Sequence, residues 1–365
     1  MPNPCPWIRE FAPDLIVPMS IEWALKPWTD EFLAGKPPLL CPTGEALQLE
    51  RDRDFSRELC ARHGVPFARS YFVANRAEAE RKIKETQRPY VIKNPLCSPS
   101  SPIHTIVCET PAETLAWLAR VDDSEGIFLQ EYLGRREAGH IALVSGGQIV
   151  SLVTNQEYKR AFTGNMGLVA GAPLGGLVEQ DSGDKYGLAR ALLHPLRPWF
   201  EAVDYRGPVQ VTAMWHEDRW NVLEYNVRLG VTSGPLILRM LANPLETMLA
   251  CVRGEPIQPR WRAGANCGCN LTLAGWGYPY TQLTGPKTPI TVEGDLTCDV
   301  WWQEVEGKAP SKLEAAGHRL CDVAAIGETI PAAIELAYQN MRRIHSLASY
   351  YRTDVGQSLW PPGSP

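Results

Sequence analysis

The 365-residue sequence lacks a long apolar run and an excess of basic charge. No run approaches the length of a membrane span, and the opening stretch MPNPCPWIREFAP has neither the basic nor the apolar segment of a leader peptide, so we expect a cytoplasmic protein without a membrane partner. The formal net charge of -5 argues against a nucleic-acid partner, because neutralising phosphates takes a basic surface. These absences favour a small molecule as the ligand.

Metal-type cysteine spacing and nucleophilic catalytic motifs are also missing. Of ten cysteines only Cys267 and Cys269 lie close together, as CGC, which is not a zinc-ligand pattern. Reduced cysteines acting as small apolar side chains are the simpler interpretation. No Ser/His/Asp or Cys/His arrangement is recognisable. The sequence therefore gives no sign of a zinc site or of a side-chain nucleophile.

Alternating strand and helix patterns fill the first part of the chain. Residues 14–19 and 38–43 read as strands around a helix over 22–35, which predicts a parallel βαβ unit. Residues 48–64 have the spacing of one helix that ends at Gly64. Further strands are predicted at 90–95 and 126–133 with helices between them. An α/β arrangement follows.

The pattern becomes antiparallel after residue 139. Residues 139–159 predict a hairpin turning at SGGQ, and 207–228 predict another turning at HEDR. From about residue 257, short strands are followed by a helix over 329–347, which predicts a small α+β lobe. The fold class is therefore mixed, α/β with α+β.

Lys93 and the segment after residue 126 are the first candidates for a nucleotide site. Lys93 ends the apolar strand YVIKNP, where an anion such as a phosphate would explain it, although an exposed strand-end lysine is equally compatible. The segment FLQEYLGRREAG offers backbone groups at 130–133 to an adenine edge and carries the acidic Glu131 and Glu137. Neither feature is specific alone.

The strand NVLEYNVRLG, residues 221–230, carries the clearest signal. Alternate strand residues share a face, so Glu224, Asn226 and Arg228 project the same way. Carboxylate and amide oxygens are hard ligands suited to Mg²⁺ on triphosphate oxygens, and an arginine beside them can hold a transferring phosphoryl group. A solvated strand face is the competing interpretation.

The order of these parts resembles the ATP-grasp superfamily and, more closely, the glycinamide ribonucleotide synthetase family, also called phosphoribosylamine–glycine ligase. The likeness runs from about residue 13 to 360. The stretches that carry it are CPTGEALQLERDRDFSRELCARHGVPFA (41–68), TNQEYKR (154–160), GNMG (164–167), LEYNVRLG (223–230), LAGWGYP (273–279), AAGHRLCDVAAIGET (315–329) and YYRTDVG (350–356).

The resemblance implies an ATP-grasp fold in three parts. Residues 1–45 would be a remnant of an N-terminal domain, 46–255 the ATP-grasp module and 256–365 a C-terminal lobe. It also implies a reaction of purine biosynthesis, in which ATP phosphorylates a carboxylate and an amine displaces phosphate to leave an amide. ATP and Mg²⁺ (or Mn²⁺) would be required, with a small carboxylate and amine as substrates. A monomer or small homo-oligomer is expected.

Carried over residue by residue, the resemblance implies specific roles. Glu224 and Asn226 would hold the metal, and Arg228 would face the acyl phosphate. The residues that would contact the nucleotide are Arg53 and Lys93 at the phosphates, Gln130, Glu131, Tyr132 and Leu133 at the adenine, and Glu137 at the ribose.

Three departures from the family leave the substrate open. No glycine-rich turn precedes Asp14, so the expected cradle for a sugar 5-phosphate is missing and poor handling of phosphoribosylamine is predicted. Pro95, Pro99 and Pro102 stand in a loop where the family has glycine and lysine, so serine hydroxyls or His104 would have to replace lost N–H donors. The sequence GVTSGP replaces acidic residues after the Glu-x-Asn strand. The alternatives are a ligase for another amine or amino acid and a non-catalytic nucleotide-binding paralogue.

Overall fold

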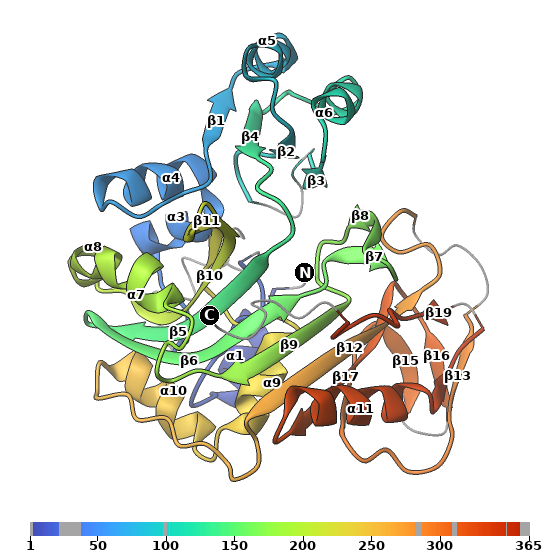
Figure 1. The fold of residues 1–365 in the computed structure, drawn as a ribbon. Helices are drawn as coiled ribbons and strands as arrows, with labels where there is room; N and C mark the ends of the chain where they lie inside the picture. The colour runs from blue at the N-terminus through green and yellow to red at the C-terminus, as the bar shows by residue number, and fades with distance from the viewer. Residues whose placement is uncertain are drawn as a thin grey trace. The chain divides into compact units, whose positions relative to one another are not determined.

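The computed structural model describes most of the chain, in two compact units (Figure 1). The described residues are 3–21, 38–97, 101, 103–281, 287–308, 312–347 and 349–357. The first unit comprises 1–152, 181–230 and 243–259, and the second comprises 153–180, 231–242 and 260–365. The division falls inside strand β6 (Gln148–Glu157).

A small antiparallel sheet in the first unit has the strand order β1-β4-β2-β3. Two helices pack beside it, α5 against β1 and β4 and α6 against β2. Each begins at a side-chain cap: Asn75 accepts a hydrogen bond from the Glu78 N–H, and Thr110 accepts one from the Glu113 N–H. The bounds are β1 Ser70–Val73, α5 Arg76–Thr86, β2 Tyr90–Lys93, β3 Ile106–Val107, α6 Pro111–Leu118 and β4 Ile127–Glu131.

A second set of strands in the first unit, β5, β10 and β11, is also antiparallel. The turn between β10 and β11 has φ values of 50° at Glu217 and 54° at Asp218, and the turn after β5 has φ values of 55° at Gly146 and 78° at Gly147. Both predicted turns are therefore confirmed. The bounds are β5 Glu137–Ser145, α7 Leu188–Leu192, η3 His194–Leu196, α8 Arg197–Ala202, β10 Arg206–His216, β11 Arg219–Asn226 and α10 Pro244–Arg253.

The N-terminal part of the first unit contains the predicted parallel pairing. Ile16 and Leu39 form a parallel bridge, in which the Ile16 N–H donates to Pro38 and the Leu40 N–H donates to Ile16. The helix predicted between them, over 22–35, lies outside the described residues. The helix α1 (Cys5–Phe11) precedes this bridge.

The single helix predicted over 48–64 is interrupted in the structure. A 3₁₀ turn, η2 (Gly44–Leu47), leads into α3 (Gln48–Arg51), and α4 (Arg53–Arg62) begins anew. Asp52 is extended at φ -115° and ψ 111°, and its carboxylate accepts the N–H groups of Asp54 and Phe55. An aspartate that caps a following turn competes with a continuous helix. The break makes Arg53 the first residue of α4.

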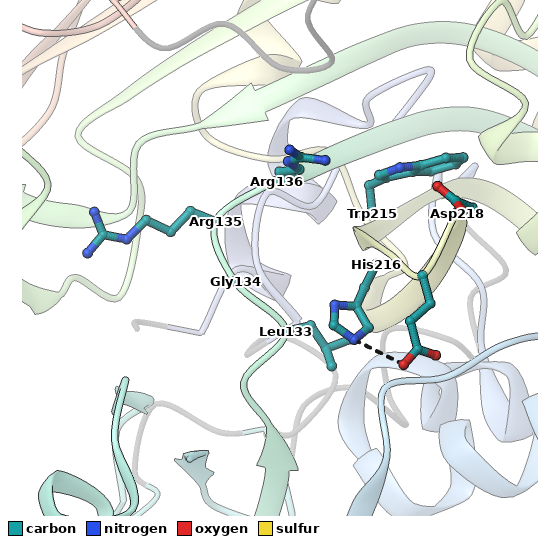
Figure 2. Close-up of a pocket in the computed structure, with 8 residues that line it drawn as sticks. Leu133, Gly134, Arg135, Arg136, Trp215, His216 and Asp218 are labelled. Carbon is teal, nitrogen blue, oxygen red and sulfur yellow. Dashed lines mark ion pairs between the residues drawn. The ribbon is translucent and has the colours of Figure 1, made fainter. Parts of the chain in front are cut away.

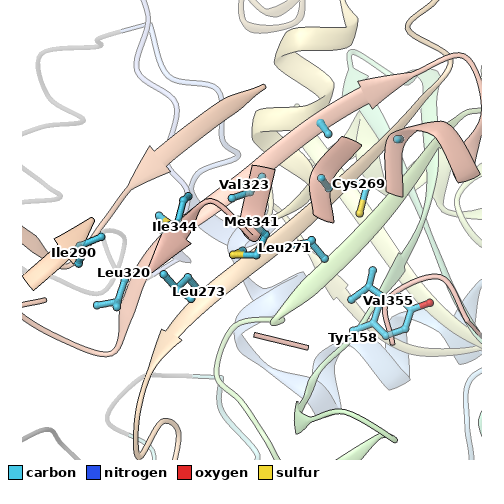
Figure 3. Close-up of a cluster of buried hydrophobic side chains, with 14 of the residues drawn as sticks. Tyr158, Cys269, Leu271, Leu273, Ile290, Leu320, Val323, Met341, Ile344 and Val355 are labelled. Carbon is cyan, nitrogen blue, oxygen red and sulfur yellow. The ribbon is translucent and has the colours of Figure 1, made fainter. Parts of the chain in front are cut away.

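The second unit is built on an antiparallel sheet in which β12 lies between β9 and β17. Alternate residues of β12, Cys269, Leu271 and Leu273, point into a core shared with α11 (Figure 3). The strands predicted for the last third are present, but the helix predicted over 329–347 is shorter: α11 ends at Met341, and residues 344–345 form strand β18, which pairs with β13. The bounds are β7 Arg160–Phe162, β8 Met166–Val169, β9 Gly175–Gln180, α9 Ser233–Met240, β12 Cys267–Gly275, β13 Pro289–Val292, β14 Asp299–Trp302, β15 Val305–Lys308, β16 Lys312–Ala315, β17 Arg319–Gly327, α11 Ile330–Met341, β18 Ile344–His345 and β19 Ser349–Tyr350.

Membrane-spanning helices were also sought in the described ranges. No helix there combines the length and the apolar composition needed to cross a bilayer.

Candidate functional site

One face of the β5, β10 and β11 strands in the first unit carries the predicted metal-binding residues. Glu224 pairs with Thr212, and Asn226 pairs with Gln210, so both side chains project from the same face as their partners on β10. A bulge at Leu223 of β11, opposite Thr212 and Ala213 of β10, shifts the register of the pair by one residue. The prediction that Glu224 and Asn226 share a strand face is confirmed, but Arg228, predicted on the same strand face, lies beyond the end of β11 at Asn226.

Glu137 lies on this same face. It begins β5 opposite Met214, which is two residues from Thr212 on β10 and therefore points the same way. Its side chain is half-buried. The strand register thus places Glu137 and Glu224, which are far apart in sequence, on one surface.

Two cations converge on the Glu224 carboxylate. Arg53 Nη1 lies 3.3 Å from Glu224 Oε2, and Lys93 Nζ lies 3.7 Å from the same oxygen. The Arg53 Nε also donates to the backbone carbonyl of Asn94 at 3.0 Å, which fixes the start of α4 against the end of β2. The structure therefore brings three predicted residues together around one oxygen.

Gln130 holds Lys93 in this position. Its Oε1 accepts a hydrogen bond from Lys93 Nζ at 2.8 Å, and its Nε2 donates to the backbone carbonyl of Leu223 at 3.0 Å. Gln130 is buried, and Lys93 is only 5% exposed, so the ammonium is not a solvated strand-end lysine. The amide links β4 to β11 and aims the lysine at Glu224.

Arg228 belongs to a second cluster with Asn226 and Glu50. Arg228 Nη2 donates to Asn226 Oδ1 at 3.0 Å and lies 3.2 Å from Glu50 Oε1. Glu50 Oε2 accepts the Val227 N–H at 2.7 Å. Burial raises the pKa of Glu50, while the charge of Arg228 and the Val227 N–H oppose that rise.

Sequence reasoning missed Glu50. The residue lies in α3, beside the buried Leu49, and follows buried Ala46 at helical spacing. A carboxylate on an apolar helix face needs a partner, and this feature of the sequence could have identified Glu50 as a candidate. Its partner, Arg228, lies 178 positions further along the chain, and a local sequence pattern cannot predict so distant a contact.

Several polar groups of the segment 130–133 already have partners within the protein. The Glu131 N–H donates to the Arg69 carbonyl at 2.8 Å, and the Tyr132 N–H donates to the Pro89 carbonyl at 3.0 Å. The Glu131 side chain, 6% exposed, is paired with Arg88 and Arg69. Adenine recognition would therefore use other backbone groups of this segment, not the N–H groups of 131 and 132.

Leu133 lies at a cavity of about 260 Å³ (Figure 2). The cavity is bounded by residues 133–136 and by the β10–β11 turn, 215–218. Arg135 points away from it in Figure 2 and is paired with Glu109 at 2.8 Å. The end of the predicted adenine-binding segment therefore borders a concave surface within the first unit.

Part of the proline- and serine-containing loop lies outside the described residues. These are 98–100 and 102, which include Pro99 and Pro102. Pro95 is described, and its carbonyl accepts the Arg53 N–H at 3.2 Å. His104 is exposed.

The opposite face of the same strands carries a group with metal-ligand chemistry, His140, Asp181 and Asp184. His140 pairs with Val211, which alternates with the site-facing Thr212. Burial lowers the pKa of His140, which favours the neutral ring. Asp181 accepts the Lys185 N–H, and Asp184 accepts the N–H groups of Ala189 and Arg190 in the first turn of α7, so both carboxylates have a structural role.

The Glu224 face has the donor set of a polyphosphate and divalent-cation site. The carboxylate and amide oxygens of Glu224 and Asn226 are hard ligands, and Arg53 and Lys93 supply positive charge beside them. Lys93 is positioned by a buried amide, so the charge is held in place in advance.

Comparison with known proteins agrees with this geometry. A family model described as phosphoribosylglycinamide synthetase, ATP-grasp (A) domain, matches residues 51–232. The phosphoribosylamine–glycine ligase of Synechocystis sp. is 29% identical over 341 residues, covering 90% of this chain and 80% of the relative. That of Vibrio cholerae is 26% identical over 374 residues, covering 96% and 85%.

Solved structures of ATP-grasp proteins are also similar to this chain. The crystal structure of phosphoribosylamine–glycine ligase from Thermotoga maritima has a TM-score of 0.73 at 26% identity and covers 90% of this chain and 84% of that chain. Biotin carboxylase from Campylobacter jejuni, at a TM-score of 0.68 and 14% identity, covers 95% and 78% and shares the fold alone. The fold and site define an ATP-grasp protein.

Within that class, the family model, the relatives and the Thermotoga maritima structure support the phosphoribosylglycinamide synthetase family. The expected family, the ATP-grasp fold and the enzyme class, an ATP-dependent ligase that forms C–N bonds, are confirmed.

Proposed function

We propose that the face bearing Glu137, Glu224 and Asn226 binds ATP with Mg²⁺ or Mn²⁺, and that the protein joins a small carboxylate to an amine as phosphoribosylamine–glycine ligases do. The observation that carries the proposal is the convergence of Arg53 and Lys93 on Glu224. Two cations around one partly exposed carboxylate have no evident structural purpose in a strand face.

Lys93 and Arg53 would contact the ATP phosphates in this proposal. Without nucleotide, both cations rest on Glu224, which is 26% exposed at the side chain. Binding of the nucleotide with its metal would exchange partners: the cations turn to phosphate oxygens, and Glu224 turns to the divalent ion together with Asn226. The site therefore keeps its charges neutralised before the ligand arrives.

The rest of the nucleotide would follow the strands outward from Glu224. Glu137 would accept hydrogen bonds from the ribose hydroxyls, since it lies on the same face. The segment from Gln130 through Glu131 and Tyr132 to Leu133 would meet the adenine. Gln130 contributes through Lys93 in this scheme, because its amide is engaged on both sides.

Arg228 would face the transferring phosphoryl group. ATP transfers its terminal phosphoryl group to the substrate carboxylate, and the amine then displaces phosphate to form the amide. Phosphoryl transfer requires positioning and charge neutralisation more than a side-chain nucleophile. The described side chains fit that need, because Arg228, Arg53 and Lys93 supply charge where phosphate oxygens would gather.

The domain scheme and location are part of the proposal. Residues 46–255 would form the ATP-grasp module and 256–365 the C-terminal lobe, with 1–45 belonging to a preceding domain; the family match at 51–232 falls inside the proposed module. A cytoplasmic location is supported by the ten cysteines, all of which are free thiols. Glycine with phosphoribosylamine is the first substrate pair to test.

The testing experiment is ADP release screened over amino acids, with and without phosphoribosylamine. Release that depends on both an acid and an amine supports the ligase. Metal-dependent ATP binding without release under any pair would favour a non-catalytic nucleotide-binding protein, and release with amino acids alone would favour a ligase for another amine.

A further inference from the structure

Glu50 is a buried carboxylate that touches the proposed metal and phosphoryl region only through other residues. It lies near the end of α3 and is 5% exposed. One oxygen accepts the Val227 N–H at 2.7 Å, and the other lies 3.2 Å from Arg228 Nη2. Its two oxygens thus hold the backbone and a side chain of the segment that follows β11.

The contact continues from Arg228 to a proposed metal ligand. The same Nη2 that faces Glu50 donates to Asn226 Oδ1 at 3.0 Å. A hydrogen bond to the amide oxygen fixes which end of the Asn226 side chain points along the strand face. Glu50, Arg228 and Asn226 therefore form a chain from α3 to the metal-binding face.

We propose that Glu50 is a positioning residue: it anchors Val227 and Arg228, orients Asn226 through Arg228, and balances the arginine charge beside the divalent cation. The inference rests on the proposed function, in which Asn226 holds the metal and Arg228 faces the phosphoryl group.

The charge balance gives Glu50 a role beyond packing. A guanidinium that touches a metal ligand repels the divalent cation unless a carboxylate offsets it. Glu224 lies near enough to Glu50 to influence it, but it is already engaged with Arg53 and Lys93. Glu50 is the carboxylate that lies directly on Arg228.

A purely structural role for Glu50 makes a different prediction. Its bond to the Val227 N–H needs only an acceptor oxygen, and glutamine supplies one with the same shape. Glu50→Gln therefore keeps the backbone clamp and removes the charge, whereas Glu50→Asp keeps the charge and shortens the reach. These two variants separate anchoring from charge.

The test uses the full chain and measures Mn²⁺ binding in the presence of a non-hydrolysable ATP analogue, by electron paramagnetic resonance, beside turnover with the best substrate pair. For Glu50→Gln we expect Mn²⁺ affinity and kcat to fall about 10- to 100-fold, as for other residues that support a metal ligand. The thermal midpoint and metal-free analogue binding should stay at wild-type values. Glu58→Gln is the matched control, because Glu58 is an exposed residue of α4 that pairs with Arg57 at 3.5 Å.

The results that would overturn the role of Glu50 differ from the results that would overturn the ligase proposal. Wild-type Mn²⁺ affinity in Glu50→Gln would overturn the inference and leave Glu50 as a backbone clamp. A fall in Mn²⁺ affinity in a protein that turns over no substrate pair would support the inference while the proposed function fails. If Glu50→Gln does not fold, Glu50→Asp decides: weaker Mn²⁺ binding at a normal thermal midpoint supports positioning, and unchanged binding overturns it.

Discussion

Two clusters of charge, one in each unit, use similar residues in different ways. In the first unit, Arg53 and Lys93 lie 3.3 and 3.7 Å from a Glu224 carboxylate that is 26% exposed. In the second unit, Arg352 donates twice to Asp354, at 2.8 and 2.6 Å, and is only 1% exposed. The first contacts are longer and involve a partly exposed carboxylate, and the second are short and enclosed.

The cluster around Arg352 is also saturated with other contacts. Arg352 donates to the Arg160 carbonyl at 2.9 Å and lies 5.1 Å from the centre of the Tyr158 ring. Asp354 accepts the Gly164 N–H at 3.0 Å. Such a pair joins chain segments and leaves no hydrogen-bonding capacity for a ligand, whereas the proposed function requires the Glu224 cluster to exchange partners. Contact length and the exposure of the carboxylate therefore distinguish the structural pair from the proposed binding site.

The largest expected effect is on activity at Glu224. Glu224→Gln removes a proposed metal ligand and should lower ATP turnover by at least about 100-fold, in the range seen when a preorganised electrostatic contact is lost. The free energy of unfolding should change by no more than about 1 kcal/mol, because the side chain is partly exposed. Steady-state ADP release and urea denaturation measure the two. Unchanged turnover would remove the metal assignment.

The reverse pattern is expected at Asp354. Asp354→Ala leaves the buried Arg352 without its carboxylate and should lower the free energy of unfolding of the second unit by about 3–5 kcal/mol. Hydrogen exchange of residues 158–164 reports this locally. Glu80→Ala, which breaks the exposed pair with Lys84 at 3.4 Å in helix α5, is the control and should cost about 0–1 kcal/mol. Equal losses in both variants would contradict the distinction between the two clusters.

A smaller effect is expected at Lys93. Lys93→Ala should weaken ATP binding by about 1.5–3 kcal/mol, the usual contribution of a charge-assisted hydrogen bond, and leave adenosine binding unchanged. Isothermal titration with both ligands measures the difference. If adenosine loses as much affinity as ATP, Lys93 supports the fold of the site and does not contact phosphate.

The smallest effect is the pH dependence of the second cluster. Burial raises the pKa of Asp354. The hydrogen bonds and charge of Arg352 and the Gly164 N–H lower the pKa by more than burial raises it, so the pKa lies below the ordinary 3.8. A carboxyl with a lowered folded-state pKa stabilises the fold above its unfolded pKa and loses that contribution as pH falls through the folded value. The stability gap between wild type and Asp354→Ala should be constant above about pH 5 and narrow below about pH 4. A gap that widens in acid would contradict the sign.

The features that were predicted correctly from the sequence are those that strand periodicity and local turns determine. Glu224 and Asn226 share a face because side chains alternate along a strand, and the turn at Glu217 and Asp218 follows from its residues. The break of the helix at Asp52 is a local capping effect that helical spacing did not reveal. Long-range pairing was not accessible: the contacts of Glu50 with Arg228 and of Arg53 with Glu224 do not follow from spacing. These contacts depend on register between distant segments, which tertiary packing decides.

The most direct measurement of the central claim follows oxygen from the acid to phosphate. The substrate pair with the greatest ADP release is used with ¹⁸O in both carboxylate oxygens, and the inorganic phosphate is analysed by mass spectrometry. An acyl phosphate route transfers one labelled oxygen to each phosphate, because the carboxylate oxygen that attacks phosphorus leaves with it when the amine displaces it. We predict that the wild-type protein releases labelled phosphate and that Glu224→Gln does not. Unlabelled phosphate from the wild-type protein would contradict the account.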